Sequence, residues 1–321
     1  MGQPGRRDNN SRLAACWPIE TALSSRRNPT GAMIWPMLSQ PLPLLTIAGS
    51  DSGGAAGLQA DLKTWAVLGA YGMSAVTAVT AQNSERVAAV RFLPPEFIAA
   101  QIDAVLSDYG AAAIKTGFLG QVEIVAVVAE RLAYWCTGGS QSPSYVRPII
   151  VIDPVLVNHR GEAMFPPEVA EAYRELLFPL ADLVTPNAAE ARLLGMEADH
   201  EQQTTDDSRK DGAAHGLSSA ALPRALIKGA RRTAGEIVDV FWDGQRAVEL
   251  SQPRIDTSNT HGSGDTLSAA VCYYVAEGSG WPDAIRRARA FTHAAIAHGA
   301  SWRLGAGHGP LGLRPPTAGG G

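Results

Sequence analysis

The chain has 321 residues, of which 45% are hydrophobic and 18% are charged, so it can bury the core of one large or two small domains and is neither disordered nor fibrous. A formal net charge of −4 without a basic stripe argues against nucleic acid as a partner. Three widely spaced cysteines support neither a disulfide framework nor a zinc site and point to a reducing cytoplasm. No apolar run approaches the roughly 18 residues of a membrane span, so no membrane partner is expected.

The first 43 residues are rich in arginine and lack both sustained apolar periodicity and the apolar segment of a secretory signal. We predict a disordered extension over 1–43, one folded domain over 44–310 and a flexible tail over 311–321. An organellar transit peptide or a start codon placed too early are alternative explanations of the extension. The polar segment 200–216 is predicted to be a solvated surface insertion.

From residue 44 onward, short apolar runs typical of buried strands alternate with segments of helical period. The expected strands cover 44–48, 74–80, 112–116, 149–153, 182–185 and 225–228. The expected helices cover 57–68, 95–109, 122–134, 167–177, 188–194, 265–276 and 283–298. Segments 236–243 and 245–250 read as a hairpin. The pattern predicts an α/β fold: a doubly wound, mostly parallel sheet flanked by helices on both faces, with a C-terminal β-hairpin.

Polar residues follow six of these expected strands. They are Gly49-Ser50-Asp51, Gln82-Asn83, Thr116-Gly117-Phe118, Asp153-Pro154, Thr185-Pro186-Asn187 and Lys228-Gly229. In an open parallel sheet, ligands bind in the crevice outside the carboxyl ends of the strands. The six strand ends therefore point to one site.

The segment NTHGSGDT at 259–266 precedes an expected helix. Unpaired N–H groups of a first helical turn stabilise a transferring phosphate, and Gly262 and Gly264 let the backbone approach it closely. Asp265 would accept the proton of an attacking hydroxyl. The alternative is that Asp265 only caps the helix. The chain has no P-loop, and no dinucleotide fingerprint follows its first strand.

Two carboxylates at neighbouring strand ends, Asp153 and Glu190, suit Mg²⁺ beside nucleotide phosphates. Glu190 has the alternative of a solvent-facing position on a helix. Lys228 either meets phosphate or pairs with a carboxylate. Among the histidines, His293 and His298 are expected in structural or surface roles, whereas His261 adjoins Gly262.

Five segments resemble the hydroxymethylpyrimidine/phosphomethylpyrimidine kinases of thiamine biosynthesis, which belong to the ribokinase superfamily. They are LTIAGSDSGG at 45–54, GLQADLK at 57–63, TAQN at 80–83, TPNAAE at 185–190 and NTHGSG at 259–264. The resemblance runs from about residue 44 to about residue 310, with the motifs in the right order. It implies a ribokinase-like fold and, for many members, a homodimer.

The resemblance also implies roles for individual residues. The residues implied to contact the aminopyrimidine are Gly49, Asp61 and Gln82, with Phe118 in the pocket wall. A glutamine amide has the donor and acceptor that suit a ring nitrogen beside an exocyclic amine. The residues implied on the nucleotide side are Asp153, Asn187 and Glu190 for Mg²⁺ and phosphates, Lys228 and Thr260 for ATP, and Gly262, Ser263 and Gly264 for the anion hole beside Asp265.

The implied activity is ATP-dependent phosphorylation of 4-amino-5-hydroxymethyl-2-methylpyrimidine and then of its monophosphate. The chain departs from the family in having Asp265 where many members have cysteine, Phe118 where methionine is frequent, and Ala55 in place of a common glycine. Because sugar kinases and many pyridoxal kinases of the superfamily have the aspartate, a pyridoxine or pyridoxal kinase is the first alternative. A catalytically silent pyrimidine-binding protein is the second.

Overall fold

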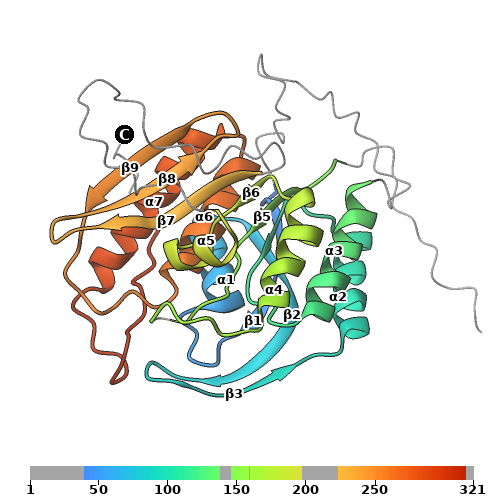
Figure 1. Ribbon diagram of the computed structural model, residues 1–321, viewed down its shortest axis with the longest axis horizontal. Coiled ribbons are helices and arrows are strands. Elements are labelled where there is room, and N and C mark those ends of the chain that lie inside the picture. Colours follow the sequence, from blue (N-terminus) through green and yellow to red (C-terminus); the bar gives the residue numbers. More distant parts are fainter. Residues whose placement is uncertain (1–39, 138–145, 159, 197–222, 316–321) are drawn as a thin grey trace, which may run out of the picture. The chain divides into compact units, whose positions relative to one another are not determined.

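The computed structural model of the protein describes residues 40–137, 146–158, 160–196 and 223–315. Most of the predicted extension, the predicted insertion at 200–216 and the chain after residue 315 lie outside the described residues. The described strands form one nine-stranded sheet in the order β3-β2-β1-β4-β5-β6-β7-β8-β9 (Figure 1). Their bounds are β1 Pro43–Ser50, β2 Tyr71–Gln82, β3 Val87–Phe92, β4 Ala113–Thr116, β5 Ile149–Ile152, β6 Leu183–Val184, β7 Arg224–Arg232, β8 Glu236–Trp242 and β9 Ala247–Pro253.

The centre of the sheet is parallel and its two edges are antiparallel. β1 pairs in parallel with β2 and β4, and parallel pairing continues through β5 and β6 to β7. β8 and β9 form the predicted hairpin, which continues the sheet from β7. The α/β fold with a mostly parallel sheet and a C-terminal hairpin is therefore confirmed.

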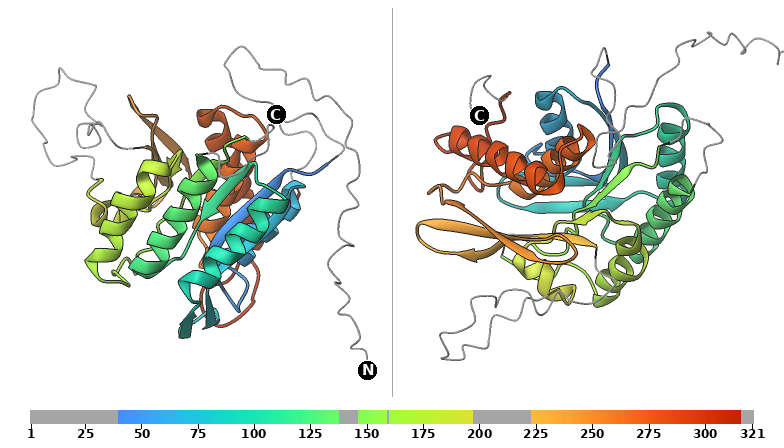
Figure 2. Two further views of the ribbon diagram at one scale, coloured as in Figure 1. Left: turned by 90° about the vertical axis from the view of Figure 1, so that its right-hand side faces the viewer. Right: turned by 90° about the horizontal axis from the view of Figure 1, so that it is seen from above.

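Helices cover both faces of the sheet, as Figure 2 shows. Their bounds are α1 Gly57–Leu68, α2 Pro95–Asp108, α3 Val122–Cys136, α4 Pro167–Ala172, α5 Ala188–Leu193, α6 Ser263–Ala276 and α7 Trp281–Gly299. One core lies between the sheet and α2, α3 and α4, and contains Ile47, Ile102 and Val128. The second core joins α1, α6 and α7 to the opposite face, around Leu44, Trp65 and Val271. Because both faces are covered, the central strands read in the sequence as continuous apolar runs.

Three details differ from the expected elements. Strand β3 was not predicted because most of its side chains are exposed at the sheet edge, so its sequence carries no apolar alternation. The expected helix 167–177 is α-helical only to Ala172, and it continues as a π turn over Tyr173–Leu177 and a 3-10 turn over Phe178–Leu180. Packing also extends slightly beyond 44–310, since Leu42 and Leu311 are both buried.

Candidate functional site

The loop after β1 is folded around the side chain of Asp51. This buried carboxylate accepts hydrogen bonds from the amides of Gly53, Ala55 and Ala56 at 2.8, 2.9 and 2.9 Å. Burial opposes its ionisation, but hydrogen bonds from His261 and from these amides lower the pKa of Asp51 overall. Asp51 therefore stays ionised and holds the glycine-rich loop in one conformation.

Gln82, at the end of β2, is connected to this loop and to His261. The Ser52 hydroxyl donates to the backbone carbonyl of Gln82 at 2.7 Å and accepts from the backbone amide of Gln82 at 2.8 Å. The side-chain nitrogen Nε2 of Gln82 lies 3.1 Å from Nε2 of His261. The structure thus brings Gln82, from the second strand, beside the segment that precedes α6.

The start of α6 is set by Gly262. Its φ of 82° is in the left-handed region, and a Cβ at this position would lie 1.7 Å from the carbonyl oxygen of Ala55. Only glycine fits both conditions. Gly262 is the N-cap residue, Ser263 and Gly264 begin the helix, and Asp265 is its third residue. The interpretation of Asp265 as the N-cap is therefore wrong.

Asp265 is the most exposed member of a buried ion cluster. Lys115, from β4, lies 3.2 Å from Oδ1 of Asp265 and 2.7 Å from Oδ1 of Asp61, and the Thr46 hydroxyl donates to Oδ2 of Asp61 at 2.6 Å. The side chains of Lys115 and Asp61 have no exposed surface, and that of Asp265 is 15% exposed. Both carboxylate oxygens of Asp61 already accept hydrogen bonds, from Lys115 and Thr46. The implied contact between Asp61 and a pyrimidine therefore stays a prediction.

Burial and the neighbouring charges act together on this cluster. Burial raises the pKa of Asp61 to about 7, against the attraction of Lys115, and the charge of Asp265 raises it further. Burial alone would lower the pKa of Lys115, but the surrounding carboxylates of Asp61, Asp265 and Asp153 raise it above its ordinary value. Lys115 is therefore a permanent buried cation.

A second ion cluster joins Asp153, which follows β5, to Lys228, which lies inside β7. The ammonium of Lys228 donates to Oδ1 of Asp153 at 2.7 Å, and the Ser268 hydroxyl, from α6, donates to Oδ2 of Asp153 at 2.9 Å. A Cβ on Gly264 would lie 3.1 Å from the same ammonium. Lys228 thus pairs with a carboxylate, and its charged end lies against the start of α6.

Glu190 is buried, so its predicted alternative as a solvent-facing residue is wrong. Its carboxylate accepts from the amides of Asn187 at 2.8 Å and Leu156 at 3.2 Å, while the Asn187 side chain caps α5. Burial raises the pKa of Glu190 to about 7; Lys228 acts against this rise and Asp153 adds to it. The observed role of Asn187 and Glu190 is a reciprocal capping box.

The charges of the two clusters fit a divalent cation. Four carboxylates (Asp61, Asp153, Glu190 and Asp265) face two ammonium groups (Lys115 and Lys228). This excess of carboxylates over ammonium groups suits a divalent cation such as Mg²⁺, and carboxylate oxygens are suitable ligands. Within the described residues, no three His, Cys, Asp or Glu side chains gather as a metal cage. Mg²⁺ here would therefore keep mostly phosphate and water ligands.

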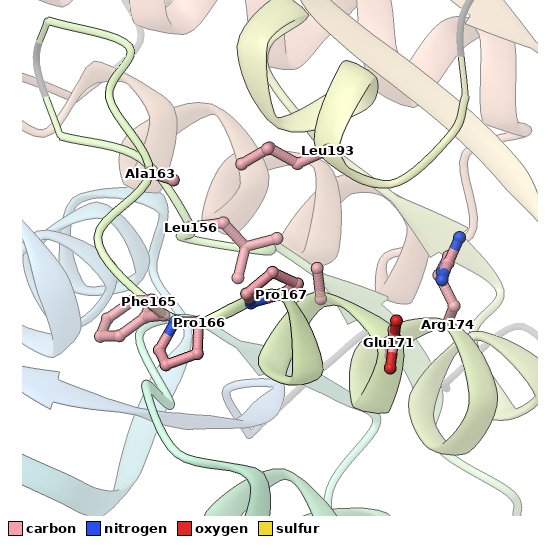
Figure 3. A pocket seen from close by; sticks show the side chains of 9 residues that line it. Leu156, Ala163, Phe165, Pro166, Pro167, Glu171, Arg174 and Leu193 are labelled. Atoms are coloured by element: carbon pink, nitrogen blue, oxygen red, sulfur yellow. The ribbon is translucent and has the colours of Figure 1, made fainter.

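Phe118 forms an aromatic wall with Phe92 and Phe165. Its ring stacks on Phe92 with centroids 5.8 Å apart and is tilted against Phe165 at 5.5 Å. A Cβ on Gly49 would lie 2.9 Å from the Phe118 ring, so the β1 loop packs directly on this wall. The cavity of about 140 Å³ in Figure 3 shares Phe165 with the wall but is lined by none of the predicted site residues.

The loop after α7 packs against Ser84, which follows β2, and against Asn259, which precedes α6. Its sequence did not indicate this contact. The amide of His308 donates to the Ser84 carbonyl at 2.9 Å, and Gly309 packs against the Asn259 side chain. Thr260 is exposed, and its carbonyl accepts from the Ser263 amide at 3.1 Å. His293 and His298 bond to the carbonyls of Pro253 and Gly312, in the structural roles expected for them.

The sequence interpretation missed Lys115 and Ser268 as parts of the site, and it placed Asp51 at a strand end of the site without assigning it a role. A signal existed for the first of these, because Lys115 interrupts the apolar run AAAIKTG and a buried ammonium requires a partner. No comparable signal exists for Ser268, whose partner Asp153 is distant in the sequence.

The parallel sheet with two helical layers, the glycine-started helix α6 and the carboxylate in its first turn define a phosphotransferase of the ribokinase-like fold. Residues 51–312 match the family model described as phosphomethylpyrimidine kinase. The chain therefore belongs to this family, and it is a kinase.

Relatives and solved structures agree with this membership. A hydroxymethylpyrimidine/phosphomethylpyrimidine kinase from Streptomyces coelicolor is 44% identical over 278 residues, which are 86% of this chain and 95% of the relative. A thiamine biosynthesis bifunctional protein from Geobacter sulfurreducens is 40% identical over 84% of this chain, which spans about half (51%) of that longer relative.

Two solved structures have the same fold. An ADP complex of Bacillus subtilis pyridoxal kinase has a TM-score of 0.70 and 37% identity, covering 85% of this chain and 97% of that one. A phosphomethylpyrimidine kinase from Clostridium difficile has a TM-score of 0.62 and 34% identity, covering 79% of this chain and 99% of that one. Among the helices of the described ranges, none is both long and apolar enough to cross a membrane.

Proposed function

We propose that the protein transfers the γ-phosphoryl group of ATP to the hydroxymethyl oxygen of 4-amino-5-hydroxymethyl-2-methylpyrimidine, and then phosphorylates the resulting monophosphate. Both reactions belong to thiamine diphosphate biosynthesis. Two observations support the assignment: family membership, and the set of polar groups at the carboxyl ends of the strands.

The observation that carries the proposal is the proximity of Gln82 to the start of α6. His261 lies 3.1 Å from the Gln82 amide and directly precedes Gly262. A planar aminopyrimidine paired with Gln82 would therefore direct its substituent toward the first turn of α6. In this proposal Gly49 and Phe118 bound the ring, and Phe118 supplies an aromatic face.

In the transfer step, one group of the protein acts on the attacking hydroxyl and another on the transferring phosphoryl group. Asp265 accepts the proton of the hydroxymethyl group while the oxygen attacks the γ-phosphorus. The bond from that phosphorus to the bridging oxygen breaks, and ADP leaves with the electron pair. Amides at Gly262, Ser263 and Gly264, with the positive end of the α6 dipole, stabilise the charge on the transferring group.

Mg²⁺ would neutralise nucleotide phosphate charge, and Asp153 and Glu190 would hold it, directly or through water. Lys228 is proposed to contact the transferring phosphate, and the position of its ammonium against Gly264 supports this. Asn187 and Thr260 are proposed to contact ATP.

Pyridoxal or pyridoxine is the second candidate substrate. It is favoured by Asp265, which replaces the cysteine frequent in pyrimidine kinases, and by the similarity to a pyridoxal kinase. Gln82 favours the pyrimidine, because its amide has both a donor and an acceptor for the ring edge.

The test is a coupled ADP-release assay with ATP and Mg²⁺ on the pyrimidine alcohol, its monophosphate, pyridoxine and pyridoxal. We expect the highest kcat/KM for the pyrimidine alcohol and measurable turnover of its monophosphate. A higher kcat/KM for pyridoxal would replace the proposed substrate, and ligand binding without ADP release would indicate a silent binding protein.

We also propose a homodimer in the cytoplasm, without nucleic acid as a partner. The dimer follows from the family resemblance, and the location follows from three widely spaced cysteines that form no Cys-x-x-Cys pair in the sequence. Light scattering of the purified protein tests the dimer, and a monomer at micromolar concentration would refute it.

A further inference from the structure

The buried Lys115 is a charged group of the site to which the proposed reaction gives no task. It contacts no open surface and lies between two carboxylates from different helices, Asp61 of α1 and Asp265 of α6. A fully buried ammonium is costly unless its partners offset its desolvation. Its place directly behind the proposed base calls for an explanation.

We propose that Lys115 is a positioning residue for phosphoryl transfer: it fixes Oδ1 of Asp265, so that Oδ2 alone faces the substrate hydroxyl, and Asp61 keeps Lys115 paired throughout the reaction. This inference rests on the proposed function, in which Asp265 is the base. It also gives Asp61 a role behind the base instead of a direct contact with the pyrimidine.

The contacts support a fixed orientation of the carboxylate. Lys115 reaches only Oδ1 of Asp265, at 3.2 Å, and among the described residues Oδ2 has no hydrogen-bond partner. The Asp265 side chain is 15% exposed while its partner is fully enclosed. In the proposal, Oδ2 is therefore the oxygen that meets the substrate hydroxyl and accepts its proton.

The second carboxylate explains how the cation tolerates the reaction. When Asp265 accepts the substrate proton, it loses its charge and no longer compensates Lys115. Asp61, at 2.7 Å, then remains as the ionised partner, itself held by the Thr46 hydroxyl at 2.6 Å. Without Asp61, each proton transfer would leave Lys115 without an ionised carboxylate in direct contact, which would slow the transfer.

Other titratable groups also act on this cluster. Asp153, which follows β5, interacts electrostatically with Lys115, and Lys228 of β7 interacts in the same way with Asp265. The buried thiol of Cys272 on α6 interacts electrostatically with both Asp61 and Lys115. The test must therefore compare charge changes at Lys115 and Asp61 with these neighbours left intact.

The test measures kcat against pH, at saturating ATP and alcohol, for the wild type, Lys115→Met, Asp61→Asn and the double variant. The base must be ionised, so activity falls as pH decreases. Loss of the Lys115 cation disfavours the ionised base, and we expect the acid-side fall of Lys115→Met at higher pH, with kcat about 10- to 100-fold lower and KM little changed. Asp61→Asn removes a negative charge, so its acid-side fall moves to lower pH.

The double variant keeps the test decisive if Lys115→Met does not fold. It removes both fully buried charges of the cluster, and its acid-side fall moves to higher pH by less than in Lys115→Met, because the loss of the Asp61 anion offsets part of the loss of the Lys115 cation. Arg289→Met is the matched control. It breaks another buried pair, with Asp239 at 2.7 Å, and should lower the melting temperature without moving the acid-side fall.

Unmoved acid-side profiles in the folded variants, or equal shifts in Lys115→Met and Arg289→Met, would overturn the inference while leaving the proposed function intact. If the wild type prefers pyridoxal, the proposed substrate fails and the same profiles are recorded with pyridoxal. A wild-type protein that phosphorylates none of the alcohols would overturn both.

Discussion

Asp265 and Asp283 occupy the same position in their helices, which allows a strict test of the proposed base. Each is the third residue of its helix, but Asp283 is on the surface, paired with Arg286. Asp265→Asn retains an oxygen for Lys115 and cannot take the substrate proton. We expect kcat to fall by about 10²–10⁴ with little change in melting temperature, whereas Asp283→Asn should keep wild-type kcat. Near-normal turnover by Asp265→Asn would assign the proton to another acceptor.

Gln82 provides the test of substrate recognition. Gln82→Leu leaves the polar edge of the pyrimidine without partners, so kcat/KM for the alcohol should decrease by an amount equivalent to roughly 1–3 kcal/mol. The apparent affinity for ATP should change little. Gln245→Leu, at an exposed turn between β8 and β9, is the control. Unchanged kinetics of Gln82→Leu would show that the ring binds elsewhere.

How far single residues were predictable depended on whether they follow a strand. Gln82 and Asp153 come at the carboxyl ends of β2 and β5, and the topology of a parallel sheet is sufficient to bring them to one edge. Lys228 ends the expected strand 225–228 but lies inside the longer β7, beyond the residues that pair in parallel with β6. Lys115 is inside a strand, where the sequence shows only a charge in an apolar run. Its two partners come from helices distant in the chain, so tertiary packing alone determines that contact.

At the scale of the secondary-structure elements, Gly262 is the residue to change, because it starts α6 and contacts the loop after β1. An alanine there would have an unfavourable φ, which costs about 1–3 kcal/mol, and its Cβ would also collide with the Ala55 carbonyl. Gly278→Ala is a matched control, since Gly278 has a φ of 108° and no atom within 4 Å of an added Cβ.

We expect both glycine variants to melt earlier, Gly262→Ala more so, and only Gly262→Ala to lose kcat/KM. Thermal melting and steady-state kinetics measure the two effects separately. Equal kcat/KM values in the two variants would mean that the contact between the two loops does not shape the site.

The elements that the sequence predicted well are those with a buried face. The helices α1, α3 and α7 have regular apolar positions, and the central strands are uniformly apolar. Strand β3 escaped prediction because an edge strand with exposed side chains has no such pattern. The π turn after α4 was not predictable either, because it serves a tertiary contact in which the buried Tyr173 hydroxyl donates to the Gly117 carbonyl at 3.1 Å.

At the scale of the whole molecule, the ordered sheet begins at Pro43 and the first buried side chain described is Leu42. We therefore expect a chain that starts at Met37 to fold and to phosphorylate as well as the full chain. Soluble yield, melting temperature and kcat/KM are the measurements. A chain that starts at Leu45 is the control, because it lacks the buried Leu42 and Leu44 and the pairing of Pro43 and Leu44 with β2. Loss of activity on starting at Met37 would give the N-terminal extension a role.

The closure of the C-terminal loop on Ser84 and Asn259 also affects the nascent chain. A ribosome needs on the order of tens of seconds to proceed from the β1 loop to Gly309, at about 5–20 residues per second. For most of that time the glycine-rich loop after β1 has been synthesised, whereas α6 and the segment 305–309 have not. The contacts of residues 305–309 with Ser84 and Asn259 therefore form only after the rest of the site has been synthesised, so they are the last part of this region to assemble.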